Sequence, residues 1–205
     1  MKKLLLLLLF CLLLSSVCLA DNFDFRGVNW GVDKETVVQA ENGLKTVKRI
    51  NFKAVPKENL SYEAELLGYK VNLQYEFNPD LVRAYYIFTD SPELKEISLN
   101  DPAKYYTDQY AMLKKSLSQK YGKPEEIEIW ANETYKNEPA SIGEHITLGH
   151  LTLKCVWETE RTVIELHCLE LLQEYNFFRN RIIYYERDYY QALKEKAPIE
   201  GLEGL

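Results

Sequence analysis

One segment in the middle of the chain constrains the fold more than any other. Between residues 104 and 121, apolar side chains recur every three or four positions and form one stripe: Tyr106, Tyr110, Leu113, Leu117 and Tyr121. Polar residues occupy the other positions, as in an amphipathic helix that buries a single face. Asp101 and Pro102 suit the start of this helix, and Gly122 with Pro124 suits its end. We therefore expect a long helix whose stripe packs on a sheet.

The residues before this helix have the pattern of strands. In residues 60–66 and 71–77, apolar side chains fall on every second position, which predicts strands with one buried face. Residues 81–88 form a third apolar run, and Gly68 and residues 78–80 provide the turns. Three strands joined by tight turns predict an antiparallel meander.

The residues after the long helix also have strand patterns. Apolar residues alternate in 151–157 and again in 164–168, with a polar turn between the two runs. Residues 179–185 predict a further strand, and residues 187–196 predict a short polar helix. Strands therefore both precede and follow the long helix in the sequence.

The order of elements predicts the fold class. A short helix at residues 34–41, with Asp33 as its N-cap, precedes the first strands as the long helix precedes the second. We predict an α+β fold of two tandem helix-plus-antiparallel-hairpin units that form a sheet with helices packed on one face. The first unit spans residues 21–98, the second spans residues 99–197, and residues 198–205 form a frayed tail.

The first twenty residues have the pattern of a secretory signal peptide. Lys2 and Lys3 precede an apolar run at residues 4–14, and small residues precede the polar Asp21. The run is short for a bilayer, which takes about 20 apolar residues, so a membrane anchor is the weaker alternative. Lipidation favours a small residue directly before the modified cysteine, so Val17 before Cys18 argues against a lipoprotein. We expect residues 1–20 to be cleaved and the mature protein to be periplasmic or secreted, without stable membrane insertion.

The charge of the chain excludes some partners. The formal net charge is −6 at pH 7, and loss of Lys2 and Lys3 makes it −8. An acidic chain without a basic cluster is not suited to nucleic acid or to anionic membrane surfaces, where Lys and Arg neutralise phosphates. We expect a protein as the partner.

Only Cys155 and Cys168 remain after signal cleavage. A turn centred on residues 159–160 would place Cys155 opposite Ile164 and would separate the two cysteines by about 13 Å along the strands. A disulfide requires Cα atoms within about 7 Å. We expect buried free thiols, with a disulfide as the alternative that an exported setting allows.

The sequence lacks a recognisable reaction centre. His145 and His150 lie in a stretch that we interpret as extended, so their side chains would point to opposite faces and could not share a metal ion. His167 alternates with core residues and should face solvent or a partner. No phosphate-binding loop, nucleophile elbow or zinc-protease motif occurs in the sequence. We expect no catalytic residue, no cofactor and no metal.

Adjacent tyrosines carry the main functional signal. Within a strand, each adjacent pair sends one ring to either face, so one ring of each pair should lie outside the core. Exposed aromatic rings are common anchors at protein interfaces. The candidate partner-binding residues are Tyr85, Tyr86, Trp157, Tyr184 and Tyr185. If the tyrosines are all buried, the loop at residues 132–143 is the next candidate.

Two motifs resemble a known group of proteins. Residues 25–37 read FRGVNWGVDKETV and resemble an FRGxxWGxxxxxV opening of bacterial exported proteins, and residues 120–124 read KYGKP, similar to a helix ending in the same group. Together they resemble the helix-plus-hairpin modules of the β-lactamase-inhibitor-like superfamily, which includes small outer-membrane assembly lipoproteins. The resemblance implies a non-enzymatic domain whose sheet or loops contact another protein. It does not imply a β-lactamase target, because no inhibitor contact residues are matched.

These features together predict an exported, non-enzymatic protein-binding module. One alternative is an envelope-assembly or structural component, which would have a membrane-bound partner. The other is a small-molecule binder or a hydrolase, which would have a deep pocket with converging polar groups.

Overall fold

The computed structural model describes residues 23–44, 48–50, 56–90, 103–172 and 177–196. The expected signal peptide, the expected helix start at Asp101 and Pro102, and the expected tail at residues 198–205 lie outside these residues. Within the described part of the chain, no helix is both long and apolar enough to cross a membrane.

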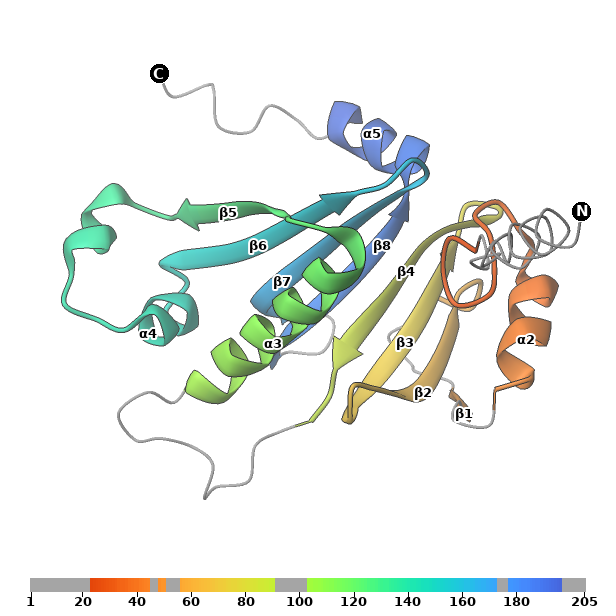
Figure 1. The fold of residues 1–205 in the computed structure, drawn as a ribbon, viewed down its shortest axis with the longest axis horizontal. Helices are drawn as coiled ribbons and strands as arrows, with labels where there is room; N and C mark the ends of the chain where they lie inside the picture. The colour runs from red at the N-terminus through yellow and green to blue at the C-terminus, as the bar shows by residue number, and fades with distance from the viewer. Residues whose placement is uncertain (1–22, 45–47, 51–55, 91–102, 173–176, 197–205) are drawn as a thin grey trace, which may run out of the picture.

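The described residues form an eight-stranded antiparallel sheet with helices against it (Figure 1). The strands are β1 (Lys48–Ile50), β2 (Leu60–Leu66), β3 (Tyr69–Phe77), β4 (Leu81–Phe88), β5 (Glu125–Trp130), β6 (Leu151–Glu158), β7 (Thr162–Leu172) and β8 (Phe177–Glu186). Their spatial order is β1-β2-β3-β4-β8-β7-β6-β5. Two blocks of four successive strands therefore meet where β4 pairs with β8, and the α+β prediction is confirmed.

The β4–β8 pair sets which residues share a face. Its register runs from Arg83 opposite Tyr185 to Ile87 opposite Arg181. Because side chains alternate along a strand, one residue of each adjacent tyrosine pair points to either face. Tyr86 belongs to the larger hydrophobic cluster on one face, whereas Tyr185 belongs to a smaller cluster on the other.

The helix α3 (Lys104–Tyr121) covers the larger cluster. Tyr110, Leu113 and Leu117 are buried in it, and Leu113 is fully buried at 0% exposure. The end of the helix is attached to the sheet, because the indole Nε1 of Trp157 donates to the carbonyl of Gly122 at 2.9 Å. The predicted apolar stripe is confirmed as a buried face.

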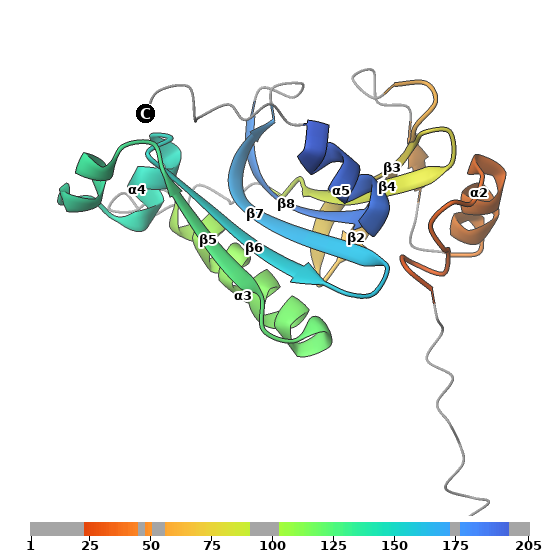
Figure 2. The same cartoon turned by 90° about the horizontal axis from the view of Figure 1, so that it is seen from above.

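The helices lie on both faces of the sheet. Val37 of α2 (Lys34–Asn42) and Ile146 of α4 (Ile142–Thr147) belong to the same cluster as the stripe of α3. Tyr190 of α5 (Arg187–Lys196) instead belongs to the smaller cluster, with Val163 and Ile183. Figure 2 shows α5 and α3 on opposite sides of the sheet. The expected arrangement with helices on one face is therefore wrong for α5, which covers apolar residues left on the second face by β7 and β8.

The N-terminal segment joins the two strand blocks. Phe25 and Val28 form a small bridge, and the Phe25 ring packs against Tyr75 and Tyr86 of the first block at centroid distances of 5.6 Å each. The same ring lies 4.8 Å from Tyr184 of the second block. The FRGVNWG sequence thus places one aromatic ring among tyrosines of both blocks.

Some elements differ from the sequence prediction. The edge strand β5 was not predicted, because its exposed glutamates have the composition of a solvated loop. Residues 132–150 contain a 3₁₀ helix, η2 (Glu133–Asn137), and α4, where we expected a loop and an extended stretch. The turn between β6 and β7 places Cys155 opposite Leu166, not opposite Ile164, so the predicted register is wrong by two residues.

Candidate functional site

The structure buries most of the predicted partner-binding rings. Trp157 is 2% exposed, Tyr86 is 4%, Tyr185 is 7% and Tyr184 is 8%. Tyr85 is only partly buried. The expectation that one ring of each pair lies outside the core is wrong for Tyr184 and Tyr185, because Phe25 of the N-terminal segment packs on Tyr184 and Tyr190 of α5 packs on Tyr185. These four rings pack the interior.

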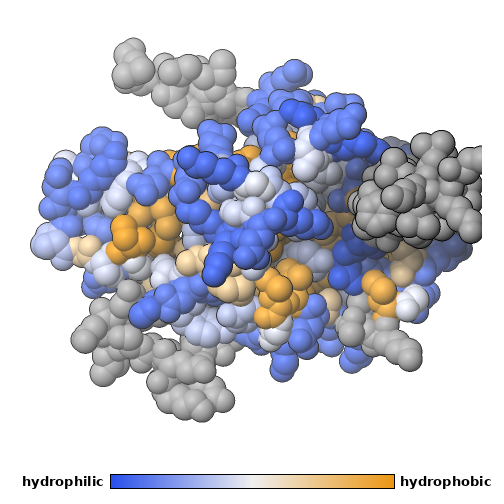
Figure 3. Space-filling view, viewed as in Figure 1, coloured by the Kyte–Doolittle hydropathy of each residue, from blue (hydrophilic) through white to orange (hydrophobic). Residues whose placement is uncertain are grey.

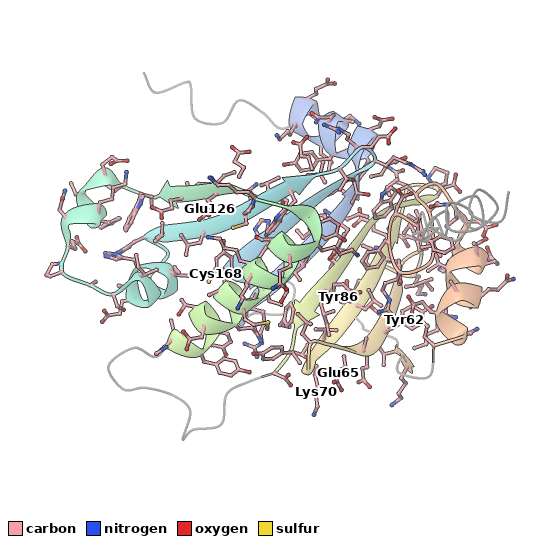
Figure 4. All side chains as sticks on the ribbon, viewed as in Figure 1. Tyr62, Glu65, Lys70, Tyr86, Glu126 and Cys168 are labelled. Atoms are coloured by element: carbon pink, nitrogen blue, oxygen red, sulfur yellow. The ribbon has the colours of Figure 1, made fainter. Side chains whose placement is uncertain are left out.

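A groove of about 410 Å³ lies beside α3, and two of these tyrosines contribute to it. Tyr86, Ile182 and Tyr184 come from β4 and β8, whereas Leu113 and Leu117 come from α3. Residues of the N-terminal segment and of the β2–β3 and β6–β7 turns complete the lining. Figure 4 shows Tyr86 in the space between α3 and the first strand block, and Figure 3 shows hydrophobic surface in the same area.

Residues near both ends of β4 contribute to the lining of the groove. Near the start of β4, where Arg83 pairs with Tyr185, its lining includes Thr162. Near the end of β4, where Phe88 pairs with Val71, its lining includes residues of the β2–β3 turn. The groove is therefore elongated and runs along α3.

Leu67 occupies an unusual position at one end of this groove. It is 56% exposed and has a φ of +54°, and Gly68 after it has a φ of +83°. The two residues form a two-residue hairpin turn, where positive φ values favour Asn-Gly because leucine is strained in the left-handed region. An exposed apolar side chain in a strained backbone position is a pattern found at functional sites.

Phe23 is the second exposed apolar residue that lines the groove. Its exposure is 50%, and it lies in the N-terminal segment, next to Asp24. The groove thus has a buried apolar floor of tyrosine, leucine and isoleucine, and an exposed apolar side chain on two of its lining segments.

Two of the charged groups that line the groove, Arg26 and Asp24, already have ion-pair partners. The guanidinium of Arg26 donates to both carboxylate oxygens of Glu41, at 2.8 and 3.0 Å. The carboxylate of Asp24 accepts from the backbone of Trp30 and pairs with Arg161. Lys120 lies over the ring of Tyr121 at 4.9 Å.

Glu41 is the acceptor at the centre of a buried polar cluster beneath the N-terminal segment. It is 2% exposed and accepts from the hydroxyl of Tyr75 as well as from Arg26. Burial raises the pKa of Tyr75, and the adjacent Glu41 carboxylate raises it further, so the phenol stays protonated and donates. This cluster is fully engaged and holds α2 to β3.

A second buried carboxylate lies on the face that α5 covers. Glu165 accepts from Lys154 at 2.8 Å and from the Tyr190 hydroxyl at 2.9 Å, and His167 Nε2 lies 2.9 Å from it. Burial acts to raise the pKa of Glu165, but the hydrogen bonds from His167 and Lys154 outweigh it and lower the pKa to about 2. His167, expected to face solvent or a partner, is instead mostly buried against this carboxylate.

Cys155 and Cys168 are buried and have free thiols, as predicted. Burial raises the pKa of both thiols, that of Cys168 to about 12. The Sγ of Cys155 lies 3.2 Å from the hydroxyl of Tyr110 on α3. A thiol reacts as the thiolate, so neither cysteine is prepared for nucleophilic chemistry.

The structure brings His145 and His150 together, contrary to the sequence interpretation. Their ring centroids lie 5.8 Å apart. The residues expected to be extended instead form α4 and a tight turn at Gly149, which has a φ of +73°. The Ser141-x-x-Glu144 capping box was the sequence signal for this helix, because serine and glutamate at this spacing satisfy the first turn.

Comparisons with family models, with curated proteins and with solved structures find no match to this chain. The candidate site is an elongated apolar groove beside α3, in which Asp24 and Arg26 form ion pairs and Lys120 lies over the ring of Tyr121.

Proposed function

We propose that this is an exported, non-enzymatic binding protein that holds an extended segment of a partner protein in the groove beside α3. The observation that carries the proposal is Leu67, an exposed leucine kept in a strained turn position at one end of an apolar groove. No interior contact of the described residues requires a leucine at position 67. An apolar side chain of a bound partner would cover the exposed Leu67 side chain.

The shape and chemistry of the groove support a polypeptide as the ligand. The groove is elongated, and its apolar floor is suited to side chains that project from an extended chain. Tyr86 and Tyr184 keep most of their rings buried, so the floor is rigid before binding, which reduces the entropy that binding costs. Lys120 provides a positive charge at the lining and favours a neutral or acidic segment.

The expected family relationship fits this proposal. Each block of four successive strands follows a helix, α2 before β1–β4 and α3 before β5–β8, in the order of tandem helix-plus-hairpin units. Such units, resembling the β-lactamase-inhibitor-like superfamily, would act by contact with another protein. The signal-like residues 1–20 support export. An envelope-assembly or structural component with a membrane-bound partner is the alternative role.

The volume of the groove supports a second candidate function. A space of about 410 Å³ lies within the range of small-molecule sites, roughly 300–1,000 Å³. An apolar or aromatic small molecule could occupy the same floor. Native mass spectrometry of the purified protein distinguishes the two, because a small ligand would be detected as an added mass.

The proposal is tested by selecting peptides from a displayed random library on the immobilised protein. We expect selected sequences rich in apolar and aromatic residues, and we expect Leu67→Asn to weaken their binding at least tenfold. The same substitution should leave the free energy of unfolding unchanged or raise it by about 0.5–1 kcal/mol, because asparagine accepts positive φ more readily than leucine.

Leu148→Asn is the matched control, since Leu148 is 65% exposed but lies after α4, away from the groove lining. The Leu148→Asn variant should bind the selected peptides with the same affinity as the wild type. Equal binding by Leu67→Asn and the wild type would overturn the proposed peptide site.

A further inference from the structure

We infer that Glu138, His145 and His150 form a binding site for a zinc ion. One ligand atom from each residue, a carboxylate oxygen or a ring nitrogen, lies within 4.8 Å of the other two. None of these residues lines the groove, so this inference is independent of the proposed peptide site.

Backbone geometry explains why two histidines five positions apart lie side by side. Gly149, with a φ of +73°, reverses the chain after α4. The N–H of His150 then donates to the carbonyl of His145 at 2.8 Å, and the N–H of Gly149 donates to the carbonyl of Ile146 at 3.0 Å. This is the Schellman pattern, in which the residue after the glycine contacts the residue three positions inside the helix end. That contact is commonly between hydrophobic residues, but here it is between two imidazoles.

Aromatic rings hold both imidazoles in place. The ring of Tyr135, from η2, stacks on His150 at a centroid distance of 3.7 Å and an interplanar angle of 5°. The ring of Trp130, at the end of β5, meets His145 edge-on at 5.0 Å. A pair of ligands whose rings are fixed before binding loses less entropy when a metal ion binds.

The hydrogen bonding of the imidazoles leaves room for a metal ion. His145 is 3% exposed, and the Nδ1 atoms of His145 and of His150 are buried without a hydrogen-bond partner among the described residues. An unpaired polar atom in the interior has lost water without compensation, which costs free energy. Coordination through Nδ1 would give both atoms a partner.

Glu138 completes the set from the solvent side. It is exposed and follows η2 directly, where its N–H donates to the carbonyl of Tyr135. Bonds of about 2.0–2.2 Å in a tetrahedral site put ligand atoms roughly 3.3 Å apart, so rotation of the exposed glutamate side chain can bring its oxygen into range.

Two imidazoles and one carboxylate favour zinc over the harder cations. Calcium and magnesium take oxygen ligands, whereas imidazole is suited to zinc, copper and nickel. Three protein ligands leave a fourth position of a tetrahedral site for water or for an external ligand. The site would also join η2 to α4, two segments that the sequence separates by a polar connection.

The test is titration of the full chain with Zn²⁺, followed by calorimetry and by NMR of the imidazole nitrogens. The chain has three histidines, so the spectrum is simple. We expect one Zn²⁺ per chain, with shifts at the resonances of His145 and His150 and none at His167. We also expect no binding of Mg²⁺ or Ca²⁺ under the same conditions.

Matched variants locate the site. His145→Ala and His150→Ala should each lower zinc affinity at least about a hundredfold, because loss of a supporting residue alone costs 10–100-fold. Glu138→Gln should also lower it, whereas His167→Gln and Glu133→Gln should not. Thermal unfolding with and without Zn²⁺ checks that each variant is folded.

Three results would overturn the inference: no bound zinc, unchanged affinity in both histidine variants, or an equal loss of affinity in His167→Gln. Tighter binding of Cu²⁺ than of Zn²⁺ is expected at any site of this kind and would leave the ligand set intact.

Discussion

Glu165 is a buried carboxylate in this sheet whose charge is compensated by its neighbours. Its side chain is 6% exposed, yet Lys154, His167 and the Tyr190 hydroxyl all lie within hydrogen-bond distance of its two oxygens. A buried carboxylate is tolerated when its lone pairs are satisfied in this way. The tyrosine comes from α5, so the same residue also attaches that helix to β7.

This arrangement predicts a dependence of stability on pH. The pKa of Glu165 is about 2 in the folded protein, compared with an ordinary value of 4.5. A carboxylate with a lowered folded pKa stabilises the fold above its unfolded pKa and loses that contribution as the pH falls toward the folded pKa. We expect a loss of about 3 kcal/mol at most between about pH 4.5 and pH 2.

Denaturant unfolding of wild type and Glu165→Gln at pH 7 and at pH 2.5 measures this contribution. The variant should be less stable at pH 7, and the difference should shrink at pH 2.5. Glu128→Gln replaces an exposed carboxylate on β5 and controls for the loss of one charge. A difference that stays constant with pH would show that the Glu165 carboxylate does not stabilise the fold.

At the scale of an element, α3 is the helix on which the larger hydrophobic cluster depends. Leu113→Ala removes a side chain that is 0% exposed and leaves a cavity between the helix and the sheet. We expect it to lower the free energy of unfolding by about 2–5 kcal/mol, as measured by urea denaturation. Lys115→Ala, on the exposed side of the same helix, should change it by less than about 0.5 kcal/mol. An unchanged midpoint for Leu113→Ala would contradict the packing of α3.

The elements that the sequence predicts well are those with strong periodicity. The stripe of α3 is a buried face, and Asp33 caps α2 by accepting from the N–H of Thr36. The alternating apolar residues of β2 and β3 are buried or half-buried as predicted, but the expectation that their second face lies in water is wrong at Ser61, Asn72 and Gln74, which are buried too. Amphipathic periodicity is created by burial of one face, so these elements are visible in the sequence.

The elements that the sequence does not reveal depend on tertiary context. β5 is an edge strand whose glutamates are exposed on its outer side, so its composition is that of a loop although it pairs with β6 along its length. Whether α5 lies on the same face as α3 is decided by the chain direction after β8, and periodicity does not carry that information.

The candidate sites were less visible in the sequence than the fold. Burial of Tyr86 and Tyr184 depends on where α3 and the N-terminal segment lie, which single-strand alternation does not specify. Leu67-Gly68 was the available signal for the groove, since leucine is an unusual first residue of a two-residue turn. Gly149 was the available signal for the approach of His145 and His150.

At the scale of the whole molecule, the N-terminal segment helps to hold the two strand blocks together. Phe25→Ala removes a ring that contacts tyrosines of both blocks, and we expect a loss of about 3–5 kcal/mol. Hydrogen exchange should show faster exchange of backbone amides in β3 and β4 and also in β7 and β8.

Phe23→Ala is the control, because Phe23 belongs to the same segment but is 50% exposed. It should leave the exchange rates of all four strands close to those of the wild type. Faster exchange in only one block after Phe25→Ala would show that the blocks unfold independently.

The pairing of β4 with β8 has a consequence for the order in which the protein can mature. A chain is synthesised from its N-terminus, and β8 is the last of the described strands, so β4 lacks this partner until residues 177–186 are available. Pairing over such a distance along the chain is slow to nucleate. An unfinished chain would therefore present the open edge of β4, and such edges promote association with other chains.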